Sequence, residues 1–140
     1  MSPTIIPYLL YEDVAAALDF LSRAFGFREH LRLTGSQGYV NHAEMRLGDS
    51  MIFLGDPGDD YRNPKRLGQE TVDLYVQVDD VDAHYERAKA AGAEIVEEPQ
   101  DQPYGDRRYG AVDQEGHRWF FAQPVADVAP EQWGAEVATP

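Results

Sequence analysis

The sequence predicts an α+β protein in which two tandem βαβββ modules form a curved mixed sheet, or cup, with the helices outside. Two observations predict this fold. The two halves of the chain repeat one order of elements, and in each half short strands with alternating apolar residues surround one helical segment. The chain has 140 residues, 43% of them hydrophobic, which is enough to bury a core in each module.

The first module is expected over residues 1–55. A short strand in "IIPYLLY" leads to a helix that begins after Asp13, a good N-cap, and ends near Gly26, where glycine tolerates the left-handed conformation. One apolar stripe runs along this helix: Val14, Ala17, Leu18, Leu21, Ala24 and Phe25. Three antiparallel strands follow in "FREHLRL", "YVNHAEMRL" and "SMIFLG", with Gly48-Asp49 as the turn between the last two.

The second module, expected over residues 71–124, follows the same plan. The strand in "VDLYVQVDD" leads to a helix that begins after Asp80, and three strands follow in "AEIVEE", "RRYGAVD" and "HRWFFAQ". Asp13 aligns with Asp80 and Pro57 aligns with Pro124, and the two residues of each pair are 67 positions apart. A constant offset over a whole half-chain indicates an internal duplication.

Two segments lie outside the predicted modules. Residues 56–70 are rich in Gly, Pro and charged residues, so we expect a flexible linker loop there. The C-terminal tail, residues 125–140, is expected to contain a short helix that starts near Pro130, with Trp133 as the residue that docks it.

Strand alternation assigns two faces to the predicted sheet. The face under the helices is expected to hold apolar side chains: Ala43, Met45, Leu47, Ile52, Leu54, Val72, Leu74, Val76, Val78, Val112, Trp119 and Phe121. The other face mixes rings with polar groups, and we expect it to bind a small molecule: Tyr8, His42, Glu44, Arg46, Phe53, Asp73, Tyr75, Gln77, Tyr109, Arg118 and Phe120. Alternatively, this face packs against the other half or a second chain, because exposing so many aromatic side chains to water is costly and favours association.

Composition restricts the function classes. The net charge is −13, so the surface repels phosphate backbones and nucleic acid is not an expected partner, whereas cationic small molecules would be attracted. No apolar run approaches the length of a membrane span, and the start lacks the basic leader of a signal peptide. The chain has no cysteine, which excludes disulfides, thiol nucleophiles and Cys-ligated zinc and fits a cytoplasmic location.

Four stretches carry a resemblance to a known family: "PYLLYEDVAAALDFLSRAFGF", "HAEMRLGDSMIFLGDP", "VDLYVQVDDVDAHYERAKAAGAEIVEEP" and "YGDRRYGAVDQEGHRWFFAQP". In their order and repetition they resemble the glyoxalase / bleomycin-resistance / extradiol-dioxygenase family, the vicinal oxygen chelate superfamily. The resemblance implies paired βαβββ modules that form a sheet cup in a homodimer. It also implies four positions at which metal enzymes of this family place ligands, namely Ile6, Phe53, Asp73 and Phe120 in this sequence.

Three of these four side chains cannot ligate a metal, so we expect no metal and no other cofactor. The metal-free members that the chain resembles bind drugs such as bleomycin and sequester them. The resemblance therefore implies a small-molecule binding protein with an aromatic, acidic cup for a cationic or aromatic ligand, and an antibiotic-resistance role.

One alternative is an enzyme. His42 and Glu44 lie two residues apart on one strand and point the same way, and with Asp73 they form a candidate metal site or acid–base pair. Under this hypothesis the protein is a lyase, an isomerase or a dioxygenase-like enzyme that uses such a metal or acid–base site. The competing interpretation is that these groups only satisfy one another at the rim of the cup. His84, within the second predicted helix, is expected at the surface.

Overall fold

The computed structural model describes residues 3–140. Its elements, in chain order, are β1 (Tyr8–Leu10), α1 (Val14–Phe25), β2 (Arg28–Thr34), β3 (Val40–Leu47), β4 (Ser50–Gly55), α2 (Pro64–Leu67), β5 (Asp73–Gln77), α3 (Val81–Ala90), β6 (Glu94–Asp101), β7 (Asp106–Val112), β8 (Arg118–Pro124) and η1 (Pro130–Trp133). Within the described range, no helix is long and apolar enough to cross a membrane.

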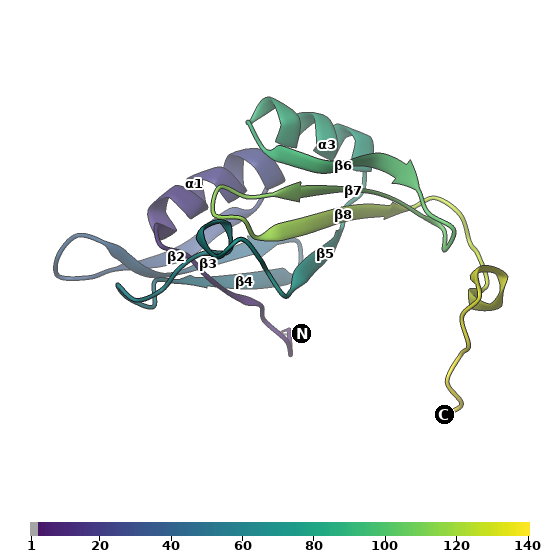
Figure 1. Ribbon diagram of the computed structural model, residues 1–140, viewed down its shortest axis with the longest axis horizontal. Helices are drawn as coiled ribbons and strands as arrows, with labels where there is room; N and C mark the ends of the chain where they lie inside the picture. The colour runs from purple at the N-terminus through teal and green to yellow at the C-terminus, as the bar shows by residue number, and fades with distance from the viewer. Residues whose placement is uncertain (1–2) are drawn as a thin grey trace.

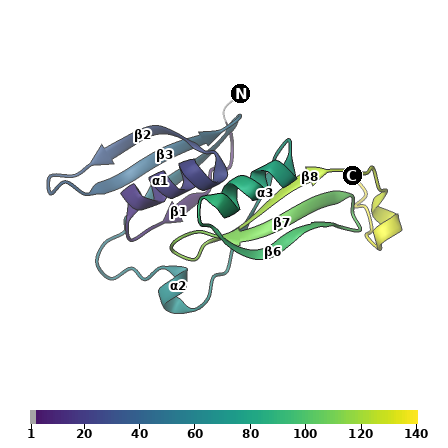
Figure 2. The same cartoon turned by 90° about the horizontal axis from the view of Figure 1, so that it is seen from above.

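The strands form two four-stranded mixed sheets with the same topology. The strand orders are β1-β4-β3-β2 and β5-β8-β7-β6, and in each sheet the first pair is parallel and the others are antiparallel. Helices α1 and α3 lie side by side over the same side of the two sheets (Figures 1 and 2). The predicted α+β fold with tandem βαβββ modules is therefore confirmed, with the sheet divided into two halves. Strands β1 and β5 are each the outer strand of their own sheet.

Both long helices begin as the sequence predicts. Asp13 Oδ1 accepts a hydrogen bond from the Ala16 amide at 3.0 Å, and Asp80 Oδ1 accepts one from the Ala83 amide at 3.1 Å. At the C-terminus of α1, Gly26 adopts a φ of 82°, which a residue with a side chain rarely adopts. The predicted apolar stripe of α1 is buried throughout.

The two modules share one hydrophobic core. Met45 and Leu54 lie under α1, and Trp119 and Phe121 lie under α3, with no exposed surface. Phe25 joins the two groups, because its ring centroid is 4.7 Å from that of Phe121 and 5.5 Å from that of Trp119. Contact between the modules therefore fixes their relative position through packed rings.

The sequence analysis assigned the two faces of β7 the wrong way round. Leu47 pairs with Ser50 across the predicted two-residue turn, whereas the second module closes the equivalent turn between Asp113 and His117 with three residues. Residues of β7 therefore follow their counterparts in β3 by 66 positions, not 67. Because strand side chains alternate, this one-residue shift exchanges the two faces of β7.

As a result, Tyr109 and Ala111 lie on the core face opposite Phe121 and Trp119, fully buried. Val112, which was expected in the core, lies half-buried on the other face. A second correction concerns Val72, which precedes β5 and is 67% exposed. The other three residues of its set, Leu74, Val76 and Val78, pack against the core.

The linker and the tail share a short motif. The linker reads "NPKRLG" from Asn63 to Gly68 and contains α2, and the tail reads "APEQWG" from Ala129 to Gly134 and contains η1. Each motif has Pro at the first helical position and a left-handed Gly at the end. The linker copy is anchored, since the Asn63 side chain is buried and donates to Glu115 at 3.1 Å.

Candidate functional site

Each sheet has a core face under the helices and an opposite face, which we call its concave face. The concave face of the first sheet carries a cluster of three rings, from Tyr8, His42 and Phe53. Tyr8 lies beside Phe53 because β1 pairs with β4, and His42 comes from the neighbouring β3. The three ring centroids lie 5.3–5.6 Å apart and the rings meet edge to face, the geometry that aromatic quadrupoles favour. Gly55 makes room for this cluster, since a Cβ there would lie 2.7 Å from the Tyr8 ring.

A chain of hydrogen bonds runs through the same cluster. The Tyr8 hydroxyl lies 2.9 Å from His42 Nδ1, and His42 Nε2 lies 3.0 Å from a Glu44 carboxylate oxygen. In the tautomer that places the ring hydrogen on Nε2, His42 Nε2 donates to the Glu44 carboxylate and Nδ1 accepts a hydrogen bond from the Tyr8 hydroxyl. The structure thus brings together three of the predicted site residues in one polar chain whose outer end is exposed.

The concave face of the second sheet is organised around an ion pair. Arg118 Nε and Nη2 donate to the two carboxylate oxygens of Asp73 at 2.8 and 3.0 Å, and Arg118 also pairs with Glu70 at 3.1 Å. The hydrogen bonds from Arg118 hold the pKa of Asp73 below its usual value. Both oxygens of Asp73 are therefore engaged within the chain.

Phe120 lies at the centre of this second face. Its ring is close to two guanidinium groups, with Arg108 Cζ at 4.5 Å and Arg118 Cζ at 5.7 Å from the centroid. Gly110, opposite Phe120 on β7, leaves room for the ring, because a Cβ there would lie 2.9 Å from it. Arg108 is in turn paired with Glu97 at 3.2 Å.

Tyr75 extends the face toward the loop between β6 and β7. Its hydroxyl donates to Asp106 Oδ2 at 2.6 Å and lies 3.1 Å from the Tyr104 hydroxyl. Burial, followed by the hydrogen bonds to Asp106 and Tyr104, raises the pKa of Tyr75 above its ordinary value. The phenol therefore stays protonated at neutral pH and 44% of the residue surface is exposed.

One predicted site residue, Tyr109, does not lie on these faces. Tyr109 is in the core, where its hydroxyl bonds to His84 Nδ1. His84, expected at the surface, is half-buried and also bonds to the Phe25 carbonyl at 3.0 Å. Gln77 follows Tyr75 on the same face at the end of β5, beside the cleft between the modules, and Arg46 is exposed on the face of β3 that carries His42 and Glu44.

Sequence reasoning missed Tyr104 and Glu70, which the structure places at the site. It interpreted Asp106 and Arg108 as part of a loop before the last hairpin that either closes over a ligand or anchors the loop by Arg–carboxylate pairing. Arg108 was not assigned to the sheet face because the two faces of β7 were exchanged, and the longer turn "DQEGH" in place of "LGDS" was the signal that would have corrected this. Tyr104 and Asp106 belong to the "YGD" stretch at which the loop after β6 enters β7, and its conformation depends on contacts that strand alternation does not report.

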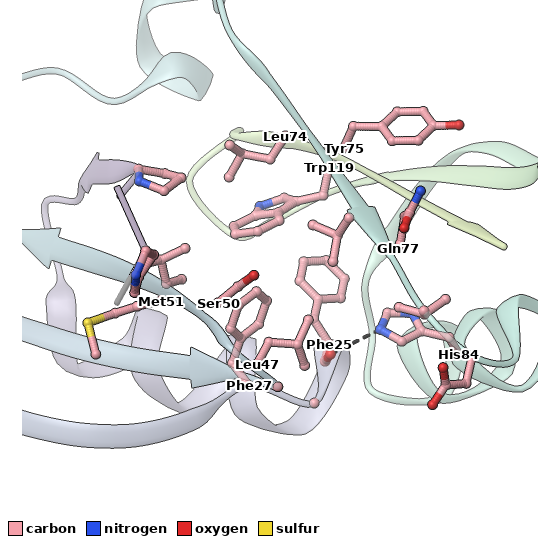
Figure 3. A pocket seen from close by; sticks show the side chains of 18 of the residues that line it. Phe25, Phe27, Leu47, Ser50, Met51, Leu74, Tyr75, Gln77, His84 and Trp119 are labelled. Carbon is pink, nitrogen blue, oxygen red and sulfur yellow. Dashed lines mark hydrogen bonds between the residues drawn. The ribbon is translucent and has the colours of Figure 1, made fainter. Parts of the chain in front are cut away.

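A cavity lies in the cleft between the two modules. Its volume is about 780 Å³, and Figure 3 shows Phe25, Phe27 and Leu47 of the first module and Leu74 and Trp119 of the second around it. The lining is mainly apolar, and it includes the open edge of β5. The concave faces are instead open surfaces, so a ligand on them would be enclosed only when something covers them.

Comparison with known proteins decides the family. The family model described as "Glyoxalase/Bleomycin resistance protein/Dioxygenase superfamily" matches residues 5–121. The chain belongs to this superfamily. An uncharacterized protein of Mycobacterium bovis, Mb0911c, is 36% identical over 145 residues, which cover 99% of this chain and 95% of that protein.

Two crystal structures of superfamily-like folds are similar to this chain. TioX from Micromonospora sp. ML1 is 36% identical, with a TM-score of 0.74, and the match covers 89% of this chain and 100% of that one. A glyoxalase/bleomycin resistance protein/dioxygenase from Nocardioides is 20% identical, with a TM-score of 0.70, and the match covers 99% of this chain and 91% of that one. The second likeness shows the fold alone.

The residues present do not fit the metal site that the superfamily implies. Ile6, Phe53 and Phe120 offer no donor atom, and Asp73 uses both oxygens on Arg118. Elsewhere in residues 3–140, no three His, Asp or Glu side chains converge as a metal site would require. What the concave faces offer a ligand is rings, one imidazole–carboxylate pair and several ion pairs.

Proposed function

We propose that this superfamily member binds and sequesters a small aromatic, cationic molecule on its concave faces without a metal. One observation carries the proposal: the Tyr8, His42 and Phe53 rings form an edge-to-face cluster backed by the Glu44 carboxylate. Tyr8 is 55% exposed, so the cluster presents a ring edge and face to a ligand. Each ring–ring contact adds about 0.5–1.5 kcal/mol beyond area burial, so a few rings suffice for useful affinity.

Charge supports a cationic ligand. The net charge of −13 attracts cations from solution, and the Glu44 carboxylate lies next to the ring cluster. The basic groups of the second face, Arg108 and Arg118, are each paired with an acid and do not repel a cation as free charges would. Sequestration of a toxic natural product in this way would give resistance to that compound.

We further propose that the protein is a cytoplasmic homodimer. The open edges of β1 and β5 support a dimer, because unpaired strand edges with exposed apolar side chains favour association. Tyr8, Leu10 and Val72 are exposed along these edges. The absence of cysteine supports a reducing compartment.

The test is a thermal-shift screen with planar aromatic cations, including proflavine and ethidium, followed by calorimetric titration of any compound that raises Tm. We expect a stabiliser whose affinity falls on Phe53→Ala. Val137→Ala is the matched control, since Val137 is an exposed apolar residue of the C-terminal tail, outside the first sheet that carries the ring cluster. Equal binding by Phe53→Ala and Val137→Ala would contradict the proposed site, and a panel with no stabiliser would contradict the ligand class.

A second candidate function is metal-free acid–base catalysis. It is favoured by the Tyr8–His42–Glu44 chain, in which Glu44 orients the imidazole and His42 Nδ1 faces the exposed Tyr8 hydroxyl. Asp73 of the original trio is engaged with Arg118 on the other sheet and takes no part. Mass spectrometry distinguishes the candidates: sequestration returns the bound compound unchanged, whereas catalysis converts it and conversion stops in His42→Gln.

A further inference from the structure

We propose that the C-terminal segment, residues 125–134, is a wall of the ligand site on the second sheet, and that Trp133 contacts the bound molecule. This inference rests on the proposed binding function and extends it to a segment outside the two modules. Figure 1 shows the segment leaving the end of β8 and descending on the side of the sheet opposite the helices. Its position is therefore at one end of the concave face.

The start of the segment is held in a defined direction. The Val125 and Ala126 amides both donate to the Gly105 carbonyl, at 2.8 and 3.0 Å. Gly105 has a φ of +104°, and a Cβ there would lie 2.3 Å from the Ala126 carbonyl oxygen. Only glycine allows this close approach, so the loop between β6 and β7 is shaped to receive the segment.

The end of the segment is also ordered. Helix η1 is closed at its start by a hydrogen bond from the Ala129 amide to Gln132 Oε1 at 3.0 Å, and Gly134 ends it with a φ of 91°. This turn places Trp133 edge to face against Tyr104, with the ring centroids 5.9 Å apart. Trp133 nevertheless keeps 43% of its surface exposed, so much of the indole remains available.

Trp133 completes a series of rings that starts on the sheet. Phe120 and Tyr75 have centroids 6.5 Å apart, the Tyr75 and Tyr104 hydroxyls are 3.1 Å apart, and Tyr104 contacts Trp133. The series runs from the centre of the concave face to the tail. A long planar ligand that lies on Tyr75 would reach Trp133 in the same direction.

The charges along this series select the ligand. The Phe120 end is covered by the guanidinium of Arg108, whereas segment 125–140 contains three acids and no Lys or Arg. Asp106 adds a carboxylate next to Tyr75. An indole in acidic surroundings favours a cation over its face. The ligand class is therefore an elongated polycyclic aromatic with its positive charge toward the Trp133 end.

The experiment measures binding of proflavine, a planar aromatic cation, to the full chain by fluorescence anisotropy. We expect Trp133→Ala to weaken binding by about five- to tenfold and Trp133→Phe to restore part of the loss, because one ring contact is removed and then replaced. Val137→Ala is the matched control, since Val137 is an exposed apolar residue of the same tail and should bind as the parent does. A second readout uses the two tryptophans: Trp119 is fully buried, so proflavine should quench the emission of Trp133.

The outcomes separate the two proposals. Proflavine binding that is equal in the parent and in Trp133→Ala, with tryptophan emission unchanged, overturns the role of the tail and leaves the binding function standing. Failure of the parent protein to bind proflavine overturns the ligand class and with it the inference. Weaker binding in Trp133→Ala but not in Val137→Ala, together with quenching, supports it.

Discussion

Removing the Tyr109 hydroxyl should loosen the junction between the modules. His84 Nε2 faces the Phe25 carbonyl, which can only accept, so this nitrogen carries the proton. His84 Nδ1 therefore accepts from the Tyr109 hydroxyl, and the imidazole links β7 and α3 to the end of α1. The ring also packs on Phe121 with centroids 4.2 Å apart, so it has little freedom to find another partner.

The expected cost of Tyr109→Phe is about 1–2 kcal/mol of unfolding free energy, because an acceptor in a half-buried site loses its donor. For a chain of this size that corresponds to a fall in Tm of roughly 3–8 °C. Urea unfolding followed by Trp119 fluorescence measures the change. Tyr85→Phe is the matched control, since Tyr85 is a buried neighbour of Tyr109 whose hydroxyl bonds to no other described residue.

The same junction predicts a pH dependence. Burial lowers the pKa of His84 below its model-peptide value of 6.5, so the folded state binds this proton less readily than the unfolded chain does. The stability that the neutral imidazole contributes is present above pH 6.5 and is lost as pH falls toward the lowered pKa, by at most about 1.4 kcal/mol per pH unit. Unfolding curves at pH 7.5 and 5.5 should therefore show a larger loss in the parent than in His84→Gln.

Two results would refute this reasoning. A Tyr109→Phe protein as stable as Tyr85→Phe would show that the hydroxyl does not support His84. A loss of stability between pH 7.5 and 5.5 that is equal in the parent and in His84→Gln would show that another group carries the pH dependence.

Three further predictions concern the core and the site. Gly110→Ala should destabilise the fold by about 1–2 kcal/mol in urea unfolding, because the new Cβ meets the Phe120 ring at 2.9 Å and the packed sheet yields little; unchanged stability would mean that the ring is free to move. Asp113→Asn should cost about 2–3 kcal/mol, because Oδ2 accepts from Tyr11 and Trp119 while Oδ1 accepts the Glu115 and His117 amides, and the Asn NH2 group would face one of these pairs of donors; a cost near zero in the same assay would contradict that network. Dialysis against EDTA should leave Tm unchanged in a thermal-shift assay, and a drop of several degrees would indicate a structural metal.

The sequence predicts those features that depend on near neighbours. Asp13 and Asp80 cap their helices through amides three residues away, and Gly48-Asp49 fixes the register that places Glu44 opposite Phe53. Each of these interactions involves a few consecutive residues or one short hairpin. Local pattern alone is therefore sufficient to predict them.

Prediction fails where a distant contact or one extra turn residue decides the outcome. The longer turn before β8 moves Tyr109 into the core, and nothing within β7 itself reports the change. Glu115 accepts the amides of Glu12 and Asp13 at 2.7 and 2.9 Å, so the second module helps to hold the start of α1. No periodicity in the sequence links residues a hundred positions apart.

The corrected register also decides how the two halves of the site compare. With β7 shifted by one residue, Phe53 still matches Phe120 and Tyr8 still matches Tyr75. In each module these two rings are neighbours, with centroids 5.6 Å apart for Tyr8 and Phe53 and 6.5 Å apart for Tyr75 and Phe120.

The acid–base groups have no such counterpart. His42 corresponds to Arg108 and Glu44 corresponds to Gly110, so the imidazole–carboxylate pair exists in one module only. What both modules keep is a pair of rings beside a strand edge, and what differs is the charge around it. A protein that used acid–base chemistry needs only the first face, whereas one that binds an extended aromatic molecule can use both. The duplicated ring pair therefore favours binding over catalysis as the function that the fold supports in both halves.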